Sequence, residues 1–186
     1  MIKAFTVGKD IFSSQGHVLI IAEIGTGHNG GLQKAKELIA AAKESGADAV
    51  KFQIVYADEI LHPDTGFVNL PTGRIPLYER FRELECSIDF YGELAQYTHK
   101  LGMLFSASAF GLRSADELRQ LNPAFIKIAS PELNHFPLLE RVASFGLPVI
   151  LSTGVSRLGD IERAISCLES NGLPADMRAL LHCVTA

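Results

Sequence analysis

The sequence predicts an α/β fold of the (β/α) TIM-type barrel class, with the first six of eight strand–helix units present. Short apolar segments of strand length alternate with segments whose apolar residues recur at helical spacing. Polar residues lie near the C-terminal end of every predicted strand, which favours a barrel with one shared mouth over an open sheet with one crevice. Four glycines each end a helix shortly before the next strand begins: Gly46, Gly102, Gly146 and Gly172.

The composition is that of a globular domain. The 186 residues are 47% hydrophobic and 20% charged, which is enough for one core, and the net charge of -4 argues against a nucleic-acid partner. The apolar runs at 18–22 and 147–151 are too short to span a membrane, and the N-terminus lacks the apolar core of a signal peptide. Cys86, Cys167 and Cys183 lie far apart, as reduced and packed thiols do, so a cytoplasmic location is expected.

The N-terminal half begins with a predicted hairpin over residues 1–17, in which two β-prone pieces flank Gly8-Lys9-Asp10 and cap one end of the domain. The elements that follow are strand 18–24, glycine-rich loop 25–30, helix 31–45 and strand 49–55. The loop does not match a nucleotide-binding pattern. Segment 56–85 contains several prolines and glycines, and its length predicts an irregular, functional loop.

The rest of the chain repeats the strand–helix cycle tightly. Ser87 is predicted to cap a helix that runs to about Lys100. The elements after it are strand 103–108, helix 114–121, strand 124–129, helix 137–144, strand 148–152, helix 158–170 and strand 179–184. Residues 18–186 are therefore expected to form an incomplete (β/α)8 barrel, in which the first and sixth strands each lack a neighbour.

Two of the predicted buried strands carry a lysine in an apolar setting. Lys127 lies within Phe125–Ala129 and Lys51 within Ala49–Val55, where an unpaired ammonium is costly to desolvate. A single lysine of this kind is typical of an edge strand whose side chain reaches along its stem to water. Two of them, on strands that both end in polar residues, indicate a pair of cations at a shared anion-binding centre.

Such a centre suits a small substrate with two or three negative charges, for example a carboxylate and a phosphate. Glu23 and Glu132 add carboxylates at the same rim, where they could handle sugar hydroxyls or protons. The alternative for Glu23 is that it neutralises Lys51 or Lys127. His182 is interpreted as a packed or hydrogen-bonded core histidine.

Several motifs of this chain, from about residue 18 to the end, resemble those of the sialic acid (N-acetylneuraminate) synthase family. They are Ile21-Ala22-Glu23-Ile24-Gly25 with His28-Asn29-Gly30, Gly46 to Gln53, Phe125 to Ser130 with Glu132-Leu133, Leu151-Ser152-Thr153-Gly154 and Leu180-Leu181-His182-Cys183. Members of this family are TIM-barrel synthases that condense phosphoenolpyruvate with an aldose such as N-acetylmannosamine and release phosphate. The resemblance implies a nonulosonic acid as product, and hence a role in carbohydrate or polysaccharide biosynthesis.

The resemblance also implies site residues. Glu23, Lys51 and Lys127 would be the catalytic group. The residues that would bind substrate are Gln53, Ser108, Ser130, Glu132, Ser152 and Thr185. Of the whole set, Glu23, Gln53 and Glu132 would face the sugar, and the others would hold phosphoenolpyruvate. The sequence departs from the family pattern at several positions, since Ser108 stands where threonine is common, and Thr185 where asparagine or serine is usual.

The family resemblance further implies a divalent metal, Mn²⁺ or Mg²⁺, whose ligands would lie beyond Ala186, so no residue of this sequence is assigned to it. The antifreeze-like domain of the family would also lie beyond Ala186, and a full-length chain is expected to form a homodimer. The 186-residue chain by itself is therefore expected to lack synthase activity. Two other interpretations stay open: a Schiff-base aldolase with Lys127 as nucleophile, and an inactive barrel fragment that only binds a ligand or partner.

Overall fold

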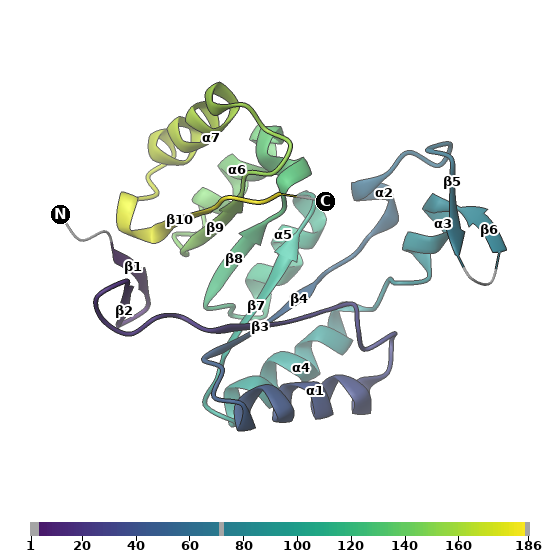
Figure 1. The fold of residues 1–186 in the computed structure, drawn as a ribbon, viewed down its shortest axis with the longest axis horizontal. Helices are drawn as coiled ribbons and strands as arrows, with labels where there is room; N and C mark the ends of the chain where they lie inside the picture. The colour runs from purple at the N-terminus through teal and green to yellow at the C-terminus, as the bar shows by residue number, and fades with distance from the viewer. Residues whose placement is uncertain (1–3, 71–72, 185–186) are drawn as a thin grey trace.

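The computed structural model describes residues 4–70 and 73–184, and its centre is one parallel sheet of six strands (Figure 1). In sheet order the strands are β3 (Ile21–Gly25), β4 (Ala49–Gln53), β7 (Leu104–Ala109), β8 (Phe125–Ile128), β9 (Val149–Ser152) and β10 (Arg178–Leu181). Within the described ranges β3 pairs only with β4, and β10 only with β9. The predicted parallel α/β sheet is confirmed, and the first and sixth of its strands are its ends, as expected.

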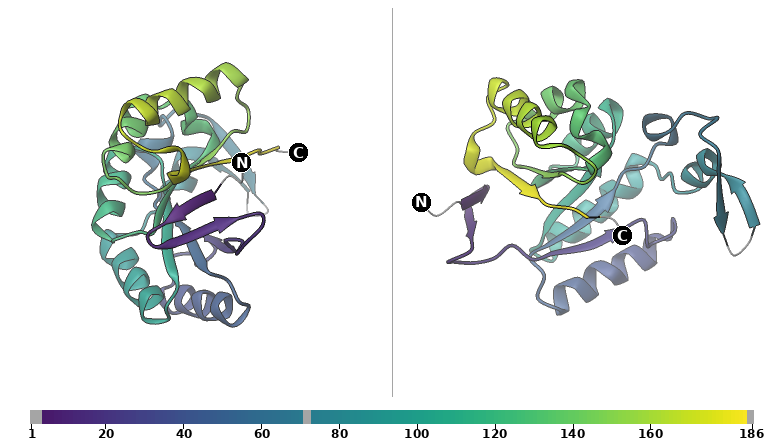
Figure 2. Two further views of the ribbon diagram at one scale, coloured as in Figure 1. Left: turned by 90° about the vertical axis from the view of Figure 1, so that its left-hand side faces the viewer. Right: turned by 45° about the horizontal axis from the view of Figure 1, so that its top comes forward.

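Each connection between neighbouring strands of the sheet carries a helix. The helices are α1 (Leu32–Glu44), α4 (Ile88–Lys100), α5 (Leu112–Gln120), α6 (Phe136–Ala143) and α7 (Leu158–Ser170), with the short 3₁₀ turns η1 (Ser130–Asn134) and η2 (Ala175–Met177) before α6 and after α7. These five helices lie together along one face of the sheet (Figure 2). No helix in residues 4–70 and 73–184 is long and apolar enough to cross a membrane.

The helix-covered face holds the main core. Strand residues of alternating position, among them Phe52, Phe105, Ile126 and Leu151, are fully buried against apolar residues of the helices. Burial of each such side chain contributes about 1.5–3 kcal/mol to folding. The opposite positions of the same strands point to the other, concave face of the sheet.

The concave face has an apolar floor near the N-terminal ends of the strands. Ala49, Phe125 and Ile150 pack there against Val7 and Phe12. The last two come from the expected N-terminal hairpin, formed by antiparallel β1 (Ala4–Val7) and β2 (Asp10–Ser13), which stands at this end of the sheet (Figure 2). The hairpin therefore closes the floor of the face that carries the lysines.

The first strand begins three residues later than predicted. Val18 and Ile20 are 59% and 55% exposed, although their apolar run predicted a buried strand. The reason is a fixed entry point, because the Ile20 N–H donates to Asp48 Oδ2 at 2.8 Å, and His17 Nε2 lies 2.8 Å from the other oxygen of that carboxylate. At the other end of the sheet, β10 stops at Leu181, so residues 182–184 lie outside the strand.

The prediction of an irregular segment over residues 56–85 is wrong. The segment contains α2 (Ala57–Ile60), the antiparallel strands β5 (Phe67–Leu70) and β6 (Gly73–Pro76), and α3 (Leu77–Arg82). Two of the residues that suggested irregular structure, Gly73 and Pro76, lie at the boundaries of elements instead. Gly73 opens β6 with a φ of 128°, which favours glycine, and Pro76 is the N-cap of α3.

The N-cap predicted at Ser87 is confirmed, because its Oγ accepts the N–H of Phe90 at 3.3 Å. We expect Ser87→Ala to lower the free energy of unfolding by about 1 kcal/mol, since one N–H of the first turn loses its acceptor. Urea denaturation measures the change. Ser87→Asp is the control, since it keeps an acceptor at the same position, and equal losses in the two variants would contradict the capping role.

Candidate anion-binding site

The polar residues of the concave face lie at the C-terminal ends of the strands. Strand register places Lys51 beside Glu23 on β3 and beside Ser106 on β7, and it places Lys127 beside Ser108. The pairing of β3 with β4 shifts between Glu23 and Gly25, which is the kind of irregularity that often re-aims a side chain next to a site. Both lysines therefore lie on the concave face, with Lys127 two residues nearer to the C-terminal ends of the strands than Lys51.

Lys51 is a buried but compensated cation. It is 9% exposed, and its Nζ lies 2.5 Å from Glu23 Oε2 and 3.3 Å from Ser108 Oγ. Glu23 is half exposed, so the pair stands at the edge of solvent. The interpretation of Glu23 as the partner that neutralises a buried lysine is what the geometry shows.

Lys127 is buried without such a partner. It is 7% exposed, and its Nζ donates to Ser152 Oγ and to the carbonyl of Ile128, both at 2.6 Å. No Asp or Glu carboxylate of the described residues lies within ion-pair distance of the Lys127 ammonium. Burial, and secondly repulsion by Lys51, lower the pKa of Lys127 to about 8.

Ser130, Gly154 and Cys183 close the site beside Lys127. Ser130 Oγ accepts the Gly154 N–H at 3.0 Å, and as a hydroxyl it can also donate one hydrogen bond. A Cβ on Gly154 would lie 2.9 Å from Ser130 Oγ and 3.3 Å from the Cβ of Cys183, so only glycine allows this approach. Hydrogen bonding, first from Ser152, lowers the pKa of the Cys183 thiol.

Glu132 supplies a second carboxyl group at this side of the site. It sits in η1, is 9% exposed, and its Oε2 has no hydrogen-bond partner within the described chain. Burial raises the pKa of Glu132, and the charge of Lys127 acts against that shift. A buried carboxyl with a free oxygen can accept a ligand hydroxyl or carry a proton.

Gln53 and Glu23 meet above Gly25. A Cβ at Gly25 would lie 3.2 Å from Glu23 Oε1 and 3.6 Å from Gln53 Nε2, and the φ of Gly25 is 55°, which also favours glycine. The hydroxyl of Tyr91 donates to the Gln53 carbonyl at 2.7 Å, which fixes the end of β4. The two polar side chains thus line one rim of the site.

Eight of the nine predicted site residues can be placed at the C-terminal ends of the strands. They form the Glu23–Lys51–Ser108 cluster with Gln53 beside it, and the Lys127–Ser152 pair with Ser130 and Glu132 beside it. The ninth, Thr185, lies outside the described residues. The substrate roles of these residues stay predictions.

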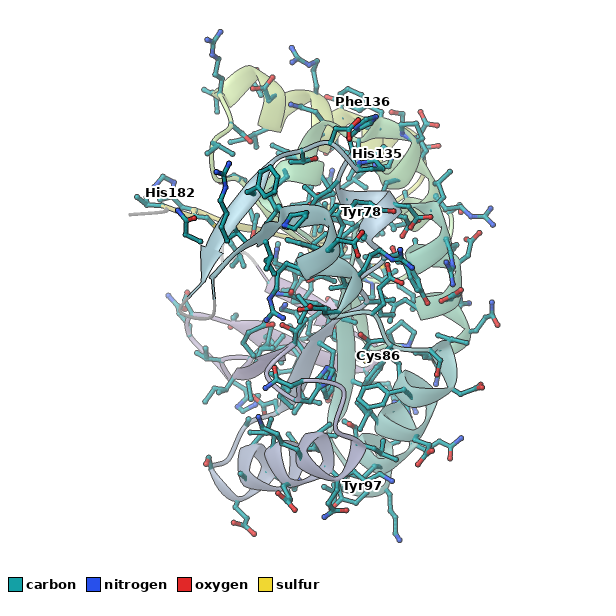
Figure 3. The ribbon with its side chains drawn as sticks, turned by 90° about the vertical axis from the view of Figure 1, so that its right-hand side faces the viewer. Tyr78, Cys86, Tyr97, His135, Phe136 and His182 are labelled. Atoms are coloured by element: carbon teal, nitrogen blue, oxygen red, sulfur yellow. The ribbon has the colours of Figure 1, made fainter. Side chains whose placement is uncertain are left out.

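The structure shows the surroundings of three further residues. His182 is exposed rather than packed in the core, so that interpretation is wrong (Figure 3). Ser106 donates to the carbonyl of Phe125 at 2.7 Å and so serves the backbone. Cys183 faces the site. Its position two residues after Leu181 could have indicated this, but the sequence does not show which face of the last strand points inward.

The described residues hold no group of three or more His, Cys, Asp or Glu side chains that could bind a metal ion. What they do offer is a compact donor set: two ammonium groups, the hydroxyls of three serines and the N–H groups of the nearby turns. One of the ammonium groups lacks a counter-charge. This arrangement can bind a small anion with more than one negative charge.

Comparison with known proteins gives consistent results. The chain is 39% identical over 173 residues to the N,N'-diacetyllegionaminic acid synthase of Legionella pneumophila, covering 89% of this chain and 48% of that protein. It is 36% identical over 180 residues to the spore coat polysaccharide biosynthesis protein SpsE of Bacillus subtilis, covering 96% and 46%. The chain thus spans about half the length of the curated relatives it matches.

Among solved structures, the N-acetylneuraminic acid (sialic acid) synthetase of Leptospira borgpetersenii, in complex with citrate, superimposes with a TM-score of 0.85. The match is 29% identical and covers 100% of this chain and 61% of that one. The sequence profile of the NeuB family matches residues 38–186, which include seven of the eight placed site residues. The chain belongs to the NeuB family.

Proposed function

We propose that this chain carries the phosphoenolpyruvate-binding part of a sialic acid-type synthase, a (β/α) barrel enzyme that condenses phosphoenolpyruvate with an N-acetylmannosamine-like aldose. The products are a nonulosonic acid and phosphate. The observation that carries the proposal is the pair of buried lysines at one mouth, of which only Lys51 is neutralised. The names of the relatives, which include synthases of sialic and legionaminic acids, support it.

In the proposed reaction C3 of phosphoenolpyruvate attacks the aldehyde carbon of the sugar, and a carbon–carbon bond forms. Water adds at C2, and phosphate leaves when the bond between C2 and the phosphate oxygen breaks. The task of this chain is to bind and orient the anion so that C3 faces the aldehyde. Lys127 is its main cationic contact, because its present partners, Ser152 and Ile128, are neutral.

Three other residues of the site have proposed contacts with the substrates. Lys51 uses two of its three N–H donors on Glu23 and Ser108, which leaves one for the ligand. Ser130 offers a hydroxyl proton beside the Gly154 turn. Glu132, buried with a free oxygen, faces the sugar hydroxyls or holds a proton during the reaction.

The divalent metal that the family resemblance implies stays part of the proposal. When bound it would supply Lewis-acid polarisation of the sugar aldehyde. The described residues contain no three-ligand group that fits it, so each step derived for this chain uses its own side chains. Homodimer formation and a cytoplasmic location are likewise proposed from the family alone.

The first prediction tests the anion site. Lys127→Met should abolish phosphoenolpyruvate binding, measured by titration calorimetry, while the variant stays folded. The free energy of unfolding should rise, because the pKa of Lys127 in the folded chain lies below its unfolded value of about 10.5. That difference makes the charged lysine destabilising below pH 8, and the penalty fades as pH rises from about 8 to 10.5.

The matched control is Lys100→Met, which removes the same charge from an exposed position at the end of α4. It should leave the affinity for phosphoenolpyruvate unchanged. Wild-type affinity in the Lys127→Met protein would exclude Lys127 from the site, and with it the observation on which the proposed function rests.

A second prediction concerns pH. The affinity for phosphoenolpyruvate should fall as pH rises through about 8, because the ammonium of Lys127 loses its proton there. Phosphate esters are fully ionised in this range, so the change reports the protein. In Lys127→Arg, whose guanidinium keeps its proton, any retained affinity should be flat between pH 7 and 9. The assignment fails if the wild-type affinity is constant across this interval.

The lowered pKa of Lys127 also favours one alternative, the Schiff-base aldolase, because a neutral amine can attack a ketone. Borohydride reduction in the presence of pyruvate separates the two functions by mass spectrometry. We expect no increase in mass on Lys127, since the proposed synthase reaction forms no imine. A reduced adduct at Lys127 that is absent from Lys127→Met would establish the aldolase chemistry instead.

A further inference from the structure

The N-terminus of α5 is capped by a residue from a distant part of the chain. Glu59, in α2, accepts the Arg113 N–H at 2.7 Å through Oε1 and the Ser114 N–H at 3.1 Å through Oε2. A carboxylate at this position satisfies two free N–H groups and the positive end of the helix dipole. The interaction links segment 56–85 to a helix that begins more than fifty residues after Glu59.

Gly111, the N-cap residue of α5, makes room for this carboxylate. A Cβ on Gly111 would lie 2.8 Å from Cγ of Glu59 and nearer still to its carboxylate group. The backbone of Gly111 is extended, with φ at -153°, which any residue can adopt. A side chain at residue 111 would therefore displace the Glu59 carboxylate, so glycine serves this contact through space and not through conformation.

Further contacts hold the base of segment 56–85. The hydroxyl of Tyr56 donates to Glu117 on α5, and the Arg113 guanidinium lies 3.7 Å from the centre of the Tyr56 ring. Near the other end of the segment, Glu85 accepts the Ala57 N–H at 2.8 Å through Oε1, which joins the two ends of the segment. We call the contact of Glu59 with residues 111–114 the latch, and these neighbouring contacts support it.

The segment that the latch holds stands next to the proposed site. It follows β4, the strand that carries Lys51 and Gln53, and it extends past the C-terminal ends of the central strands (Figure 1). The view from that side shows it, with Tyr78 of α3, in front of the sheet (Figure 3). None of the hydrogen bonds and ion pairs of Lys51 and Lys127 involves Glu59 or residues 111–114.

We propose that Glu59 is a positioning residue that, through the latch, fixes segment 56–85 at the rim of the site and thereby sets the affinity for the carbonyl sugar, the second substrate. The proposal rests on the proposed function. It assigns the two substrates to different parts of the chain: the lysines of the sheet hold the anion, and the latched segment positions the sugar. Release of the latch should therefore act on one substrate and spare the other.

Two variants break the latch by different means. Glu59→Gln removes the charge but keeps the shape of the side chain, and Gly111→Ala displaces the carboxylate by contact alone. In a full-length chain, both should raise KM for N-acetylmannosamine, on the order of tenfold to a hundredfold, because segment 56–85 loses its fixed position. The affinity for phosphoenolpyruvate, measured by calorimetry, should stay at the wild-type value. Protease cleavage within 56–85 should become faster.

The double variant Glu59→Ala/Gly111→Ala makes the test independent of general destabilisation. In the double variant the three atoms nearest to the added methyl group, all of Glu59, are gone, so this variant should match Glu59→Ala rather than sum the two effects. Gly159→Ala is the control, since it adds the same methyl group near the start of α7, where no atom lies within 4 Å. It should change neither KM nor the cleavage pattern.

The outcomes separate this proposal from the proposed function. Wild-type KM for the sugar in both Glu59→Gln and Gly111→Ala overturns the proposal, and so does an equal loss of affinity for phosphoenolpyruvate. If a full-length chain with the wild-type residues 1–186 releases no phosphate from phosphoenolpyruvate and N-acetylmannosamine, the proposed function fails. The protease assay then still decides whether Glu59 positions the segment, because it needs no substrate.

Discussion

Desolvation of two ammonium groups at one end of a parallel sheet is the constraint on which the rest of this structure depends. Lys51 and Lys127 are more than nine-tenths buried, and only Lys51 has a carboxylate partner. The uncompensated charge of Lys127 is an energetic cost to the fold, visible in its lowered pKa. The main core between the sheet and the helices offsets that cost. The free energy that keeps the site folded therefore comes from residues outside the site.

The layered concave face explains how the charges are kept away from bulk water. Below Lys127, two residues earlier on the same strand face, Phe125 packs with Val7 and Phe12 of the hairpin. This floor excludes water from beneath the lysines, so their electric field acts mainly towards the open mouth. The hairpin carries none of the predicted site residues. It contributes to the site by closing the concave face at the N-terminal ends of the strands, opposite the site.

The sequence predicts the parts of this structure that depend on local pattern. Strand alternation placed Lys51 on the same face as Gln53, and the order of helices and strands predicted the parallel sheet and its two end strands. It could not predict the contact of Glu59 with Gly111, because the two residues lie far apart in the chain and a glycine in an extended conformation carries no local signal. For the same reason Cys183 was missed, since the inward face of the last strand depends on its packing.

The two rim carboxylates, Glu23 and Glu132, differ in a way that follows from the lysines below them. Glu23 is paired with Lys51 and half exposed, so it remains an acceptor. Glu132 is buried, and a backbone hydrogen bond and the charge of Lys127 oppose the rise of its pKa. An anion bound at Lys127 would screen that charge and add its own, which raises the pKa of Glu132 further. Occupation of the anion site therefore favours the protonated form of Glu132, and this couples a proton at the sugar side to the arrival of the first substrate.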